Sequence, residues 1–328
     1  MTAPGGFSLD PYAGEADIPD IVRIVNAESA ADGVEEVWTV EGAAAWFRHP
    51  TEHFDARRDV VVGRLDGRAV AAGGLEWIDT RDGEFREYRF WGVVDPEQRG
   101  RGIGSALLAD AERRAAALAS TQQFDRRPVL GSFAAVGRPA ETLLRTAGFE
   151  EARWFFDMVR PTLDGVDPVP LPHGFELRPV TPDFHETIWR ANREAFRDHW
   201  GGSDESLAAM ARLLDDPDID TSLWLVAWDR DEVAGGVWNG IRPEENAQLG
   251  MRRGWLESVF TRRPWRKRGL ARALIARSLE LLRERGMTSA ALGVDADNPN
   301  GALGLYESAG FAVHERFVAM RKPMEIPG

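Results

Sequence analysis

The feature that most constrains the fold is an internal repeat. Three short motifs of the first half recur in the same order in the second half. Two of them are offset by 168 residues and the last by 162 residues. Self-similarity at a long period indicates duplication of one structural module. The matched landmarks are Phe7 and Phe175, Pro96 and Pro264, and the Gly-Phe pairs that end at Phe149 and Phe311.

The length and the middle of the chain agree with two modules. At 328 residues the chain is long for one hydrophobic core and suits two domains of about 150 residues each. Residues 161–174 contain four prolines and two glycines, a composition that predicts an extended linker. We therefore predict domains over residues 1–163 and 171–328, with the boundary near residue 168.

Each half alternates strand and helix patterns. The first half predicts a helix over 17–29, two strands over 59–77, a strand over 88–94 and a helix over 103–119. The second half predicts strands over 222–240 and 255–261, a helix over 269–285 and a strand over 291–296. This order predicts an α/β (α+β) fold, in which each domain has a mixed central β-sheet flanked by helices.

Composition narrows the function. The chain has no cysteine, which excludes disulfides, thiolate metal sites and a cysteine nucleophile. We expect no metal site, because the histidines show no metal-ligand spacing. The net charge of −13 disfavours nucleic acid and favours a cationic small molecule, although acidity can also serve only solubility. The sequence shows neither a secretory leader nor an apolar run of membrane-spanning length, so we expect a cytoplasmic protein that binds no membrane.

A strand that enters a basic, glycine-containing loop and then a helix occurs twice. The two segments read FWGVVDPEQRGRGIGSALL and SVFTRRPWRKRGLARALI. The first N–H groups of a helix have no intrahelical partner and lie at the positive end of the helix dipole, so they bind phosphate. Neither a P-loop nor a Rossmann fingerprint is present. The pattern therefore predicts a phosphate site of another kind in each half.

These loops resemble the R/Q-x-x-G-x-G/A signature of the GNAT superfamily of acetyltransferases. The matching segments are Arg99-x-x-Gly102-x-Gly104 and Arg266-x-x-Gly269-x-Ala271. Residues 297–311 are similar to a second GNAT motif, N-x-x-A-x-x-L-Y-x-x-x-G-F. In length and tandem arrangement the chain is similar to two-domain bacterial acetyltransferases related to mycothiol synthase. The resemblance implies acetyl-CoA as cofactor, with its pyrophosphate on the loop amides.

The resemblance also implies which residues bind the cofactor. In the second half these are Val259, Phe260, Thr261, Arg266, Lys267, Arg268, Gly269, Leu270, Ala271, Asn298, Asn300 and Ala302. In the first half they are Val93, Val94, Arg99, Gly100, Arg101, Gly102 and Gly104. The loop residues would hold phosphate, while the strand amides and Asn298 would bind the pantetheine arm.

Tyr306 stands at the position of the family's proton donor. A tyrosine suits protonation of a departing thiolate, because its pKa lies somewhat above that of a thiol. The matching position in the first half is Leu144, which cannot donate a proton. Chemistry is therefore predicted in the second half alone. The alternative is that Tyr306 packs in the core with its hydroxyl bonded to a carbonyl.

Glu257 is the predicted general base. It lies in the strand before the second loop, where family members often carry an acidic residue that takes the amine's proton, directly or through water. Strand alternation would place it on one face with Val259 and Thr261. The offset of 168 sets it against Arg89, which is not a base at neutral pH.

Other interpretations of this region stay open. Glu257 could instead form a salt bridge with Arg252 or Arg253, and Glu245 and Asp295 are reserve candidates for the base. The substrate candidates are His199 and Trp200, which begin a glycine-containing loop, and Trp238; a plain loop and core packing are the competing readings.

The function that we expect is transfer of an acetyl group from acetyl-CoA to a primary amine of a small molecule, directly within a ternary complex. One alternative is a regulatory module that binds acyl-CoA without catalysis. Another is an aminoacyl or longer-acyl transferase of the same fold, although the acidic charge disfavours tRNA. Monomer and homodimer both remain open.

Overall fold

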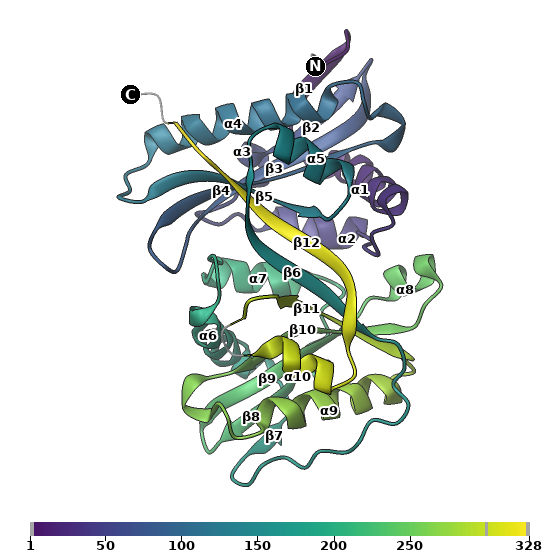
Figure 1. The fold of residues 1–328 in the computed structure, drawn as a ribbon, viewed down its shortest axis with the longest axis vertical. Helices are drawn as coiled ribbons and strands as arrows, with labels where there is room; N and C mark the ends of the chain where they lie inside the picture. The colour runs from purple at the N-terminus through teal and green to yellow at the C-terminus, as the bar shows by residue number, and fades with distance from the viewer. Residues whose placement is uncertain (1–2, 299–300, 326–328) are drawn as a thin grey trace. The chain divides into compact units, whose positions relative to one another are not determined.

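The computed structural model describes residues 3–298 and 301–325 and shows alternating strands and helices (Figure 1). The strands are β1 Phe7–Pro11, β2 Val60–Leu65, β3 Arg68–Asp79, β4 Phe85–Val94, β5 Arg127–Ala135, β6 Glu150–Arg160, β7 Glu176–Arg178, β8 Leu225–Asp229, β9 Glu232–Ile241, β10 Arg253–Thr261, β11 Ser289–Asp295 and β12 Ala312–Pro323. The helices are α1 Ile18–Asp32, α2 Val40–Arg48, α3 Ala56–Asp59, α4 Ile103–Thr121, α5 Pro139–Thr146, α6 His185–Ala195, α7 Leu207–Asp215, α8 Pro243–Leu249, α9 Leu270–Glu284 and α10 Ala302–Ser308.

Two compact units make up the chain. Unit 1 comprises residues 1–153, 200–216 and 317–328, and unit 2 comprises residues 154–199 and 217–316. Each unit is described below by itself.

The sheet of unit 1 has the order β1-β2-β3-β4-β5-β12. β4 and β5 are parallel, and the other pairs are antiparallel. Ala72 packs in a core cluster with α1, whereas a Cβ on Gly73 would meet Leu107 of α4 at 3.4 Å. Since neighbouring residues of a strand point to opposite faces, α1 and α4 cover opposite faces of the sheet.

The sheet of unit 2 has the order β6-β11-β10-β9-β8-β7, with β10 and β11 parallel. Val237 of β9 packs in a core cluster that contains the apolar side of α9. The next residue, Trp238, stacks with Trp189 of α6 at 6.2 Å. α9 and α6 therefore cover opposite faces, as α4 and α1 do in unit 1.

The two modules exchange their last strands. β6, which ends the first module in sequence, pairs antiparallel with β11 of unit 2, with Ala290 opposite Arg160. β12, which ends the second module, pairs with β5 of unit 1, with Phe317 opposite Ala135 (Figure 1). The compact units thus differ from the ranges 1–163 and 171–328, which remain our prediction for the boundaries of the duplicated module.

Most of the elements expected from local pattern are present. The helices expected over 103–119 and 269–285 are α4 and α9, and the turn at Asp66-Gly67 joins β2 to β3. The segment 161–174 has no regular structure, as expected of a linker, but Leu163 is fully buried and its N–H donates to the Thr288 carbonyl at 2.9 Å. The linker is therefore fastened to unit 2.

Candidate active site

The two strand–loop–helix segments are built alike, bond for bond. Equivalent backbone hydrogen bonds recur in both segments. The loop residues that form them are offset by 167 residues, whereas the acceptors Val70 and Ala234, on the neighbouring strands, are offset by 164. The structural counterpart of Pro96 is thus Arg263, one residue from the sequence match to Pro264. The matched bonds run from Asp95 to Val70 and from Arg262 to Ala234, from Gln98 to Asp95 and from Trp265 to Arg262, and from Ala106 to Gly102 and from Ala273 to Gly269.

Both loops present a helix N-terminus that no side chain caps. The N-cap residues are Gly102, with φ of 83°, and Gly269, with φ of 80°. No side-chain cap bonds to either, so the first-turn N–H groups of α4 and α9 point outward without an intrahelical partner. These residues fit a pyrophosphate, and in unit 2 Leu270 and Ala271 supply the first of the amides.

The first arginine of each motif anchors its loop. Arg99 pairs with Asp32 and Glu28 at 2.6 and 3.1 Å, and Glu28 also accepts from the Val94 amide at 3.3 Å. Arg266 donates to Asp198 at 2.7 Å and to two backbone carbonyls, those of Thr261 and Ala195. Their guanidiniums therefore hold the loop to the end of the first helix of each module, a structural use that the motif alone does not reveal.

Four further cations of the second loop differ in their ion pairs. Arg262 pairs with Glu194 and Glu232, and Arg263 pairs with Asp198. Lys267 and Arg268 are exposed and form no ion pair with any residue in the described part of the chain, and the Arg268 guanidinium lies 4.6 Å from the Phe175 ring. Lys267 and Arg268 are thus the better placed to meet phosphate.

Lys267 carries backbone strain that can be tested. Its φ is 60°, whereas its counterpart in the first loop is Gly100, with φ of 74°. A left-handed conformation costs a non-glycine residue about 1–2 kcal/mol. Lys267→Gly should therefore raise the free energy of unfolding by about 0.5–1 kcal/mol in urea titrations. Arg268→Gly is the control, since Arg268 has no positive φ; equal effects of the two changes would contradict the assignment of strain.

The strands next to each loop separate. β10 pairs with β11 only as far as Trp255 opposite Ala291, although β10 continues to Thr261. β4 likewise pairs with β5 only as far as Arg89 opposite Gly131. Beyond these points the two strands no longer share a hydrogen-bonded ladder. Such an opening beside a phosphate loop can admit an extended chain such as the pantetheine arm.

Glu257 lies in a β-bulge. The register of β10 against β9 shifts between Leu256 and Ser258, so Glu257 is the extra residue. Leu256 and Val259 both pack against the core cluster on the α9 side, whereas Ser258 accepts a hydrogen bond from Asn192 of α6 at 2.7 Å. The expected alternation that put Glu257 on the face of Val259 is wrong, because the bulge resets it.

The bulge also corrects the comparison with the first half. β4 runs against β3 with no register shift from Arg86 to Val94, and Arg89 lies opposite Glu76. Counted back from the common end of the two strands, Arg89 corresponds to Trp255 of β10, and Glu257 has no counterpart. Unit 1 therefore lacks both the β-bulge and an acidic residue that corresponds to Glu257.

Glu257 is held by an arginine. The Arg242 guanidinium donates to both of its carboxylate oxygens at 2.9–3.2 Å, and the side chain of Glu257 is 29% exposed. Arg252 and Arg253 were the salt-bridge partners considered from the sequence; Arg242, which was not considered there, is one partner that the structure shows. Glu245, a reserve candidate, is buried against Arg242 and Trp255, and Asp295 accepts from the Asp297 amide.

Tyr306 is buried in unit 2 at the end of α10. It contacts Phe311 edge-on, and its hydroxyl has no hydrogen-bond partner among the described residues. The alternative of a hydroxyl bonded to a carbonyl is thus not what the described residues show. The amides of Phe311 and Phe149 donate to the carbonyls of Tyr306 and Leu144 at 3.1 Å in each case, so Leu144 is the true counterpart of Tyr306.

Burial raises the pKa of all three tyrosines, which gives a pH prediction. Desolvation raises the pKa of Tyr12 and Tyr306 above 10 and that of Tyr88 to about 12. Because the folded pKa exceeds that of the unfolded chain, stability is intact below pH 10 and falls as the pH rises from there toward each folded pKa, for Tyr88 by up to about 1.4 kcal/mol per pH unit between pH 10 and about 12. Urea titrations between pH 8 and 12 should show this, with a smaller slope in Tyr88→Phe. An unchanged slope in that variant would refute the assignment.

The structure brings two more of the predicted residues together. The side chains of His199 and Asn298 lie 3.4 Å apart, so the start of the glycine-containing loop at His199 lies beside the end of β11 in unit 2. Ala302 is the first residue of α10. Asn300 lies outside the described residues. Trp238 is buried in a stack with Trp224 at 4.3 Å, which favours core packing for this side chain.

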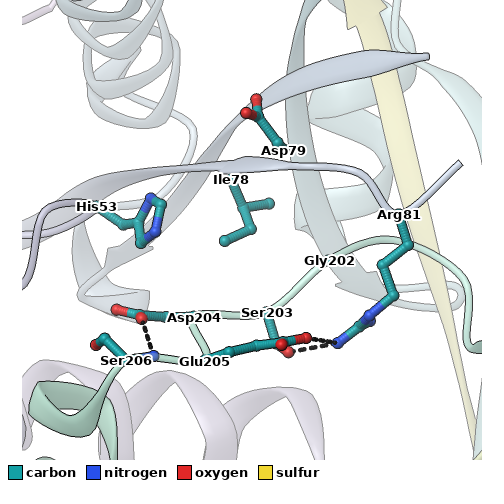
Figure 2. A pocket seen from close by; sticks show the side chains of 9 residues that line it. All are labelled: His53, Ile78, Asp79, Arg81, Gly202, Ser203, Asp204, Glu205 and Ser206. Carbon is teal, nitrogen blue, oxygen red and sulfur yellow. Dashed lines mark hydrogen bonds and ion pairs between the residues drawn. The ribbon is translucent and has the colours of Figure 1, made fainter. Parts of the chain in front are cut away.

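The rest of this glycine-containing loop, from Trp200 onward, lies in unit 1. The ring of Trp200 lies under the Arg321 guanidinium at 4.3 Å. Residues 202–206 line a hollow of about 380 Å³ together with His53, Ile78, Asp79 and Arg81. Figure 2 shows Arg81 reaching across it to Ser203, at 2.6 Å, and to Glu205. No local pattern predicts this hollow, because Arg81 and Ser203 on its two walls are 122 residues apart in the chain.

Neither a metal-binding cluster nor a membrane-spanning helix is present in the part of the chain that the structure describes. Residues 3–298 and 301–325 contain no group of three histidine or acidic residues that could hold a metal ion. Within the same ranges no helix is long and apolar enough to cross a membrane.

An uncapped helix N-terminus beside two separating strands is the site of a protein that can bind a phosphate-bearing ligand with an extended arm. The chain matches the Acetyltransferase (GNAT) family over residues 183–311 and an Acetyltransferase (GNAT) domain over residues 56–151. It is 30% identical over 327 residues to a mycothiol acetyltransferase of Geodermatophilus obscurus, covering 96% of both chains. A mycothiol acetyltransferase of Frankia alni is also 30% identical, with 95% of this chain and 93% of the relative covered.

Solved structures agree. A GCN5-related N-acetyltransferase from Sphaerobacter thermophilus superimposes with a TM-score of 0.71 at 26% identity, covering 100% of this chain and 98% of that one. A tandem GNAT protein from the clavulanic acid biosynthesis pathway, at 18% identity and a TM-score of 0.68, shares the fold over 98% of this chain and 99% of its own. The chain belongs to the GNAT acetyltransferase family, with two GNAT domains in tandem. It is an acyltransferase that uses acetyl-CoA.

Proposed function

We propose that unit 2 transfers the acetyl group of acetyl-CoA to a primary amine of a small molecule, directly within a ternary complex. The observation that carries this proposal is the buried Tyr306, whose hydroxyl has no partner among the described residues and whose counterpart in unit 1 is a leucine. The fold of the described residues makes no use of this hydroxyl, which leaves it able to donate a proton to a bound ligand.

Each group has a separate role in the proposed reaction. The amides at the start of α9, with Lys267 and Arg268, hold the phosphates of acetyl-CoA, which when bound supplies the activated thioester. Glu257 takes the proton of the acceptor nitrogen. A backbone N–H of β10 near Val259 to Thr261 stabilises the oxyanion, and Tyr306 protonates the departing thiolate. Raised by burial, the pKa of Tyr306 keeps its hydroxyl protonated at neutral pH.

We propose that unit 1 performs no chemistry. It has the uncapped start of α4, but β4 has no bulge and Leu144 replaces the acid. The regular strand and the leucine both argue for a domain that kept its loop and lost its catalytic groups. Changes in unit 1 at Arg101 or Gly104 should therefore leave kcat unaltered.

The acceptor can be searched with a panel of amines. Because the relatives are named for mycothiol, cysteinyl sugars come first, followed by amino sugars, polyamines, aminoglycosides and amino acids. CoA and acetylated products are followed by chromatography and mass, since a thiol reagent would also react with a cysteinyl acceptor. A product that survives neutral hydroxylamine is not a thioester, and one that also survives alkaline hydroxylamine is an amide and not an oxygen ester. Release of CoA with no amine, or binding of acetyl-CoA without release, would count against the proposal.

The kinetic order tests direct transfer. A ternary complex gives intersecting double-reciprocal plots when acetyl-CoA and acceptor are varied together. Parallel lines, or an acetylated protein detected by mass after incubation with acetyl-CoA alone, would indicate a covalent intermediate instead.

A further inference from the structure

Arg242 occupies a central position beside the proposed base. It lies at the end of β9, where it is the N-cap residue of α8. Its guanidinium donates three hydrogen bonds to Glu257 and one, at 3.2 Å, to Glu245. Its flat face rests 4.4 Å from the Trp255 ring. One face of this group and its N–H groups are therefore engaged by three side chains.

The partners of Arg242 are themselves fixed. Glu245 is only 2% exposed, and it accepts from the Trp255 indole N–H at 2.8 Å. Burial by itself would lower the pKa of Arg242, but the charges of Glu257 and Glu245 and the hydrogen bonds to them raise it far above its usual range. The arginine thus stays charged at every pH at which the protein is folded.

The cluster of Arg242, Glu245 and Glu257 contains two carboxylates and one cation. A fork-like guanidinium that reaches both oxygens of a carboxylate fixes its orientation as well as its charge. Without it, Glu257 would share this part of the bulge with the buried charge of Glu245. A nearby cation favours the ionised form of a carboxylate and a nearby anion disfavours it.

We infer that Arg242 is a positioning residue, which orients the carboxylate of Glu257 and offsets the charge of the buried Glu245 so that Glu257 is ready to accept a proton. The inference rests on the proposed function, because it concerns the role of Glu257 there. The proton released by the acceptor nitrogen goes to the Glu257 carboxylate, and Arg242 gives up none. Arg242 thereby sets the pH above which the Glu257 carboxylate can accept a proton from the acceptor.

Among the described residues, other charged side chains near Glu257 come from α8, β10 and α6. On α8, Glu244 is bound to Gln248; on β10, Arg253 is buried at the start of the strand; and on α6, Arg193 donates to Asn192, which bonds Ser258. On β9, Asn239 and Trp238 lie opposite the bulge and carry no charge, and Gly240 beside the Glu257 carboxylate has no side chain. Arg242 and Glu245 are the two groups that the tests change.

The first test is the pH profile of kcat/KM with acetyl-CoA and the best acceptor of the panel. Arg242→Met should move the acidic limb up by about one to two pH units, since Glu257 loses its cation and keeps its anion. The double change Arg242→Met with Glu245→Gln should move the limb back toward its original position. Arg242→Lys should keep the limb nearly in place but lower kcat about tenfold, because a single ammonium does not hold both oxygens.

A matched control is available in the same unit. Arg178 is also 30% exposed, pairs with Glu176 at 2.6 Å and stacks on Trp228 at 4.9 Å. Arg178→Met should cost less stability than Arg242→Met, because Glu176 is exposed whereas Glu245 is buried, and it should leave the pH profile and kcat unchanged. If Arg242→Met behaves as Arg178→Met does, Arg242 is only structural and the inference is overturned.

A second readout does not need turnover. Carboxyl carbon NMR of protein with labelled glutamate follows Glu257 itself, with Glu257→Gln assigning the signal. The titration of that signal should move to higher pH in Arg242→Met. A wild-type protein that acetylates no amine defeats the proposed function, whereas an active protein whose Glu257 titration is the same in Arg242→Met defeats only this inference.

Discussion

Replacing Tyr306 by phenylalanine should lower kcat by about 10²-fold or more, with little change in KM for acetyl-CoA. General acid catalysis by a positioned side chain contributes about 10²–10⁴-fold. Phenylalanine fills the same buried space, and no hydrogen bond to a described residue is lost, so the fold should be as stable as before. Steady-state kinetics and a urea titration of the same preparation measure both effects.

Tyr88→Phe is the matched control for this change. Tyr88 is likewise fully buried, but it lies in unit 1 and its hydroxyl donates to Gln122 at 2.7 Å. Its loss should cost about 1 kcal/mol of stability and leave kcat unaltered. Full activity in Tyr306→Phe would remove the acid from the proposed mechanism, whatever the stability of the variant.

Glu257→Gln should lower kcat/KM by about 10²–10³-fold at neutral pH, and the loss should shrink as pH rises. Glutamine has nearly the same size and can still accept from Arg242, but it cannot take a proton. At high pH more of the acceptor is already a free amine, so less depends on a base. Rates of CoA formation between pH 6 and 9.5 measure the trend.

Glu245→Gln separates the proposed base from its buried neighbour. It removes the other carboxylate that Arg242 contacts, and it keeps the hydrogen bond from Trp255 within reach of an amide oxygen. We expect kcat to change by less than about tenfold. A loss as large as that of Glu257→Gln would make Glu245, the reserve candidate, the better assignment for the base.

The parts of the site that the sequence predicted are those made by neighbours along the chain. Both loops lie at an uncapped helix start, as the glycines and basic residues predicted, because such a turn is made by backbone groups within a few residues. Tyr306 and Leu144 were correctly matched because the turn after each helix has the same local hydrogen bonds. Cofactor and family followed from these segments.

The parts that the sequence missed depend on distant partners. The bulge at Glu257 shows only against the register of β9, and one extra residue makes Trp255, not Glu257, the counterpart of Arg89. The motif arginines looked like phosphate ligands, yet Arg99 and Arg266 find acidic partners about 70 residues earlier in the chain. No spacing within the motif indicates this.

By itself the sequence predicted the duplication, many of the strands and helices, the two glycine-containing loops at helix starts, and the match of Tyr306 to Leu144. These follow from periodicity and from hydrogen bonds between close neighbours, which each stretch of chain carries with it. Only the tertiary structure decided that β6 and β12 are exchanged and that Arg242 holds Glu257. Strand pairing and ion pairs form between whichever groups the folded backbone brings within reach, and that distance is not written in any local pattern.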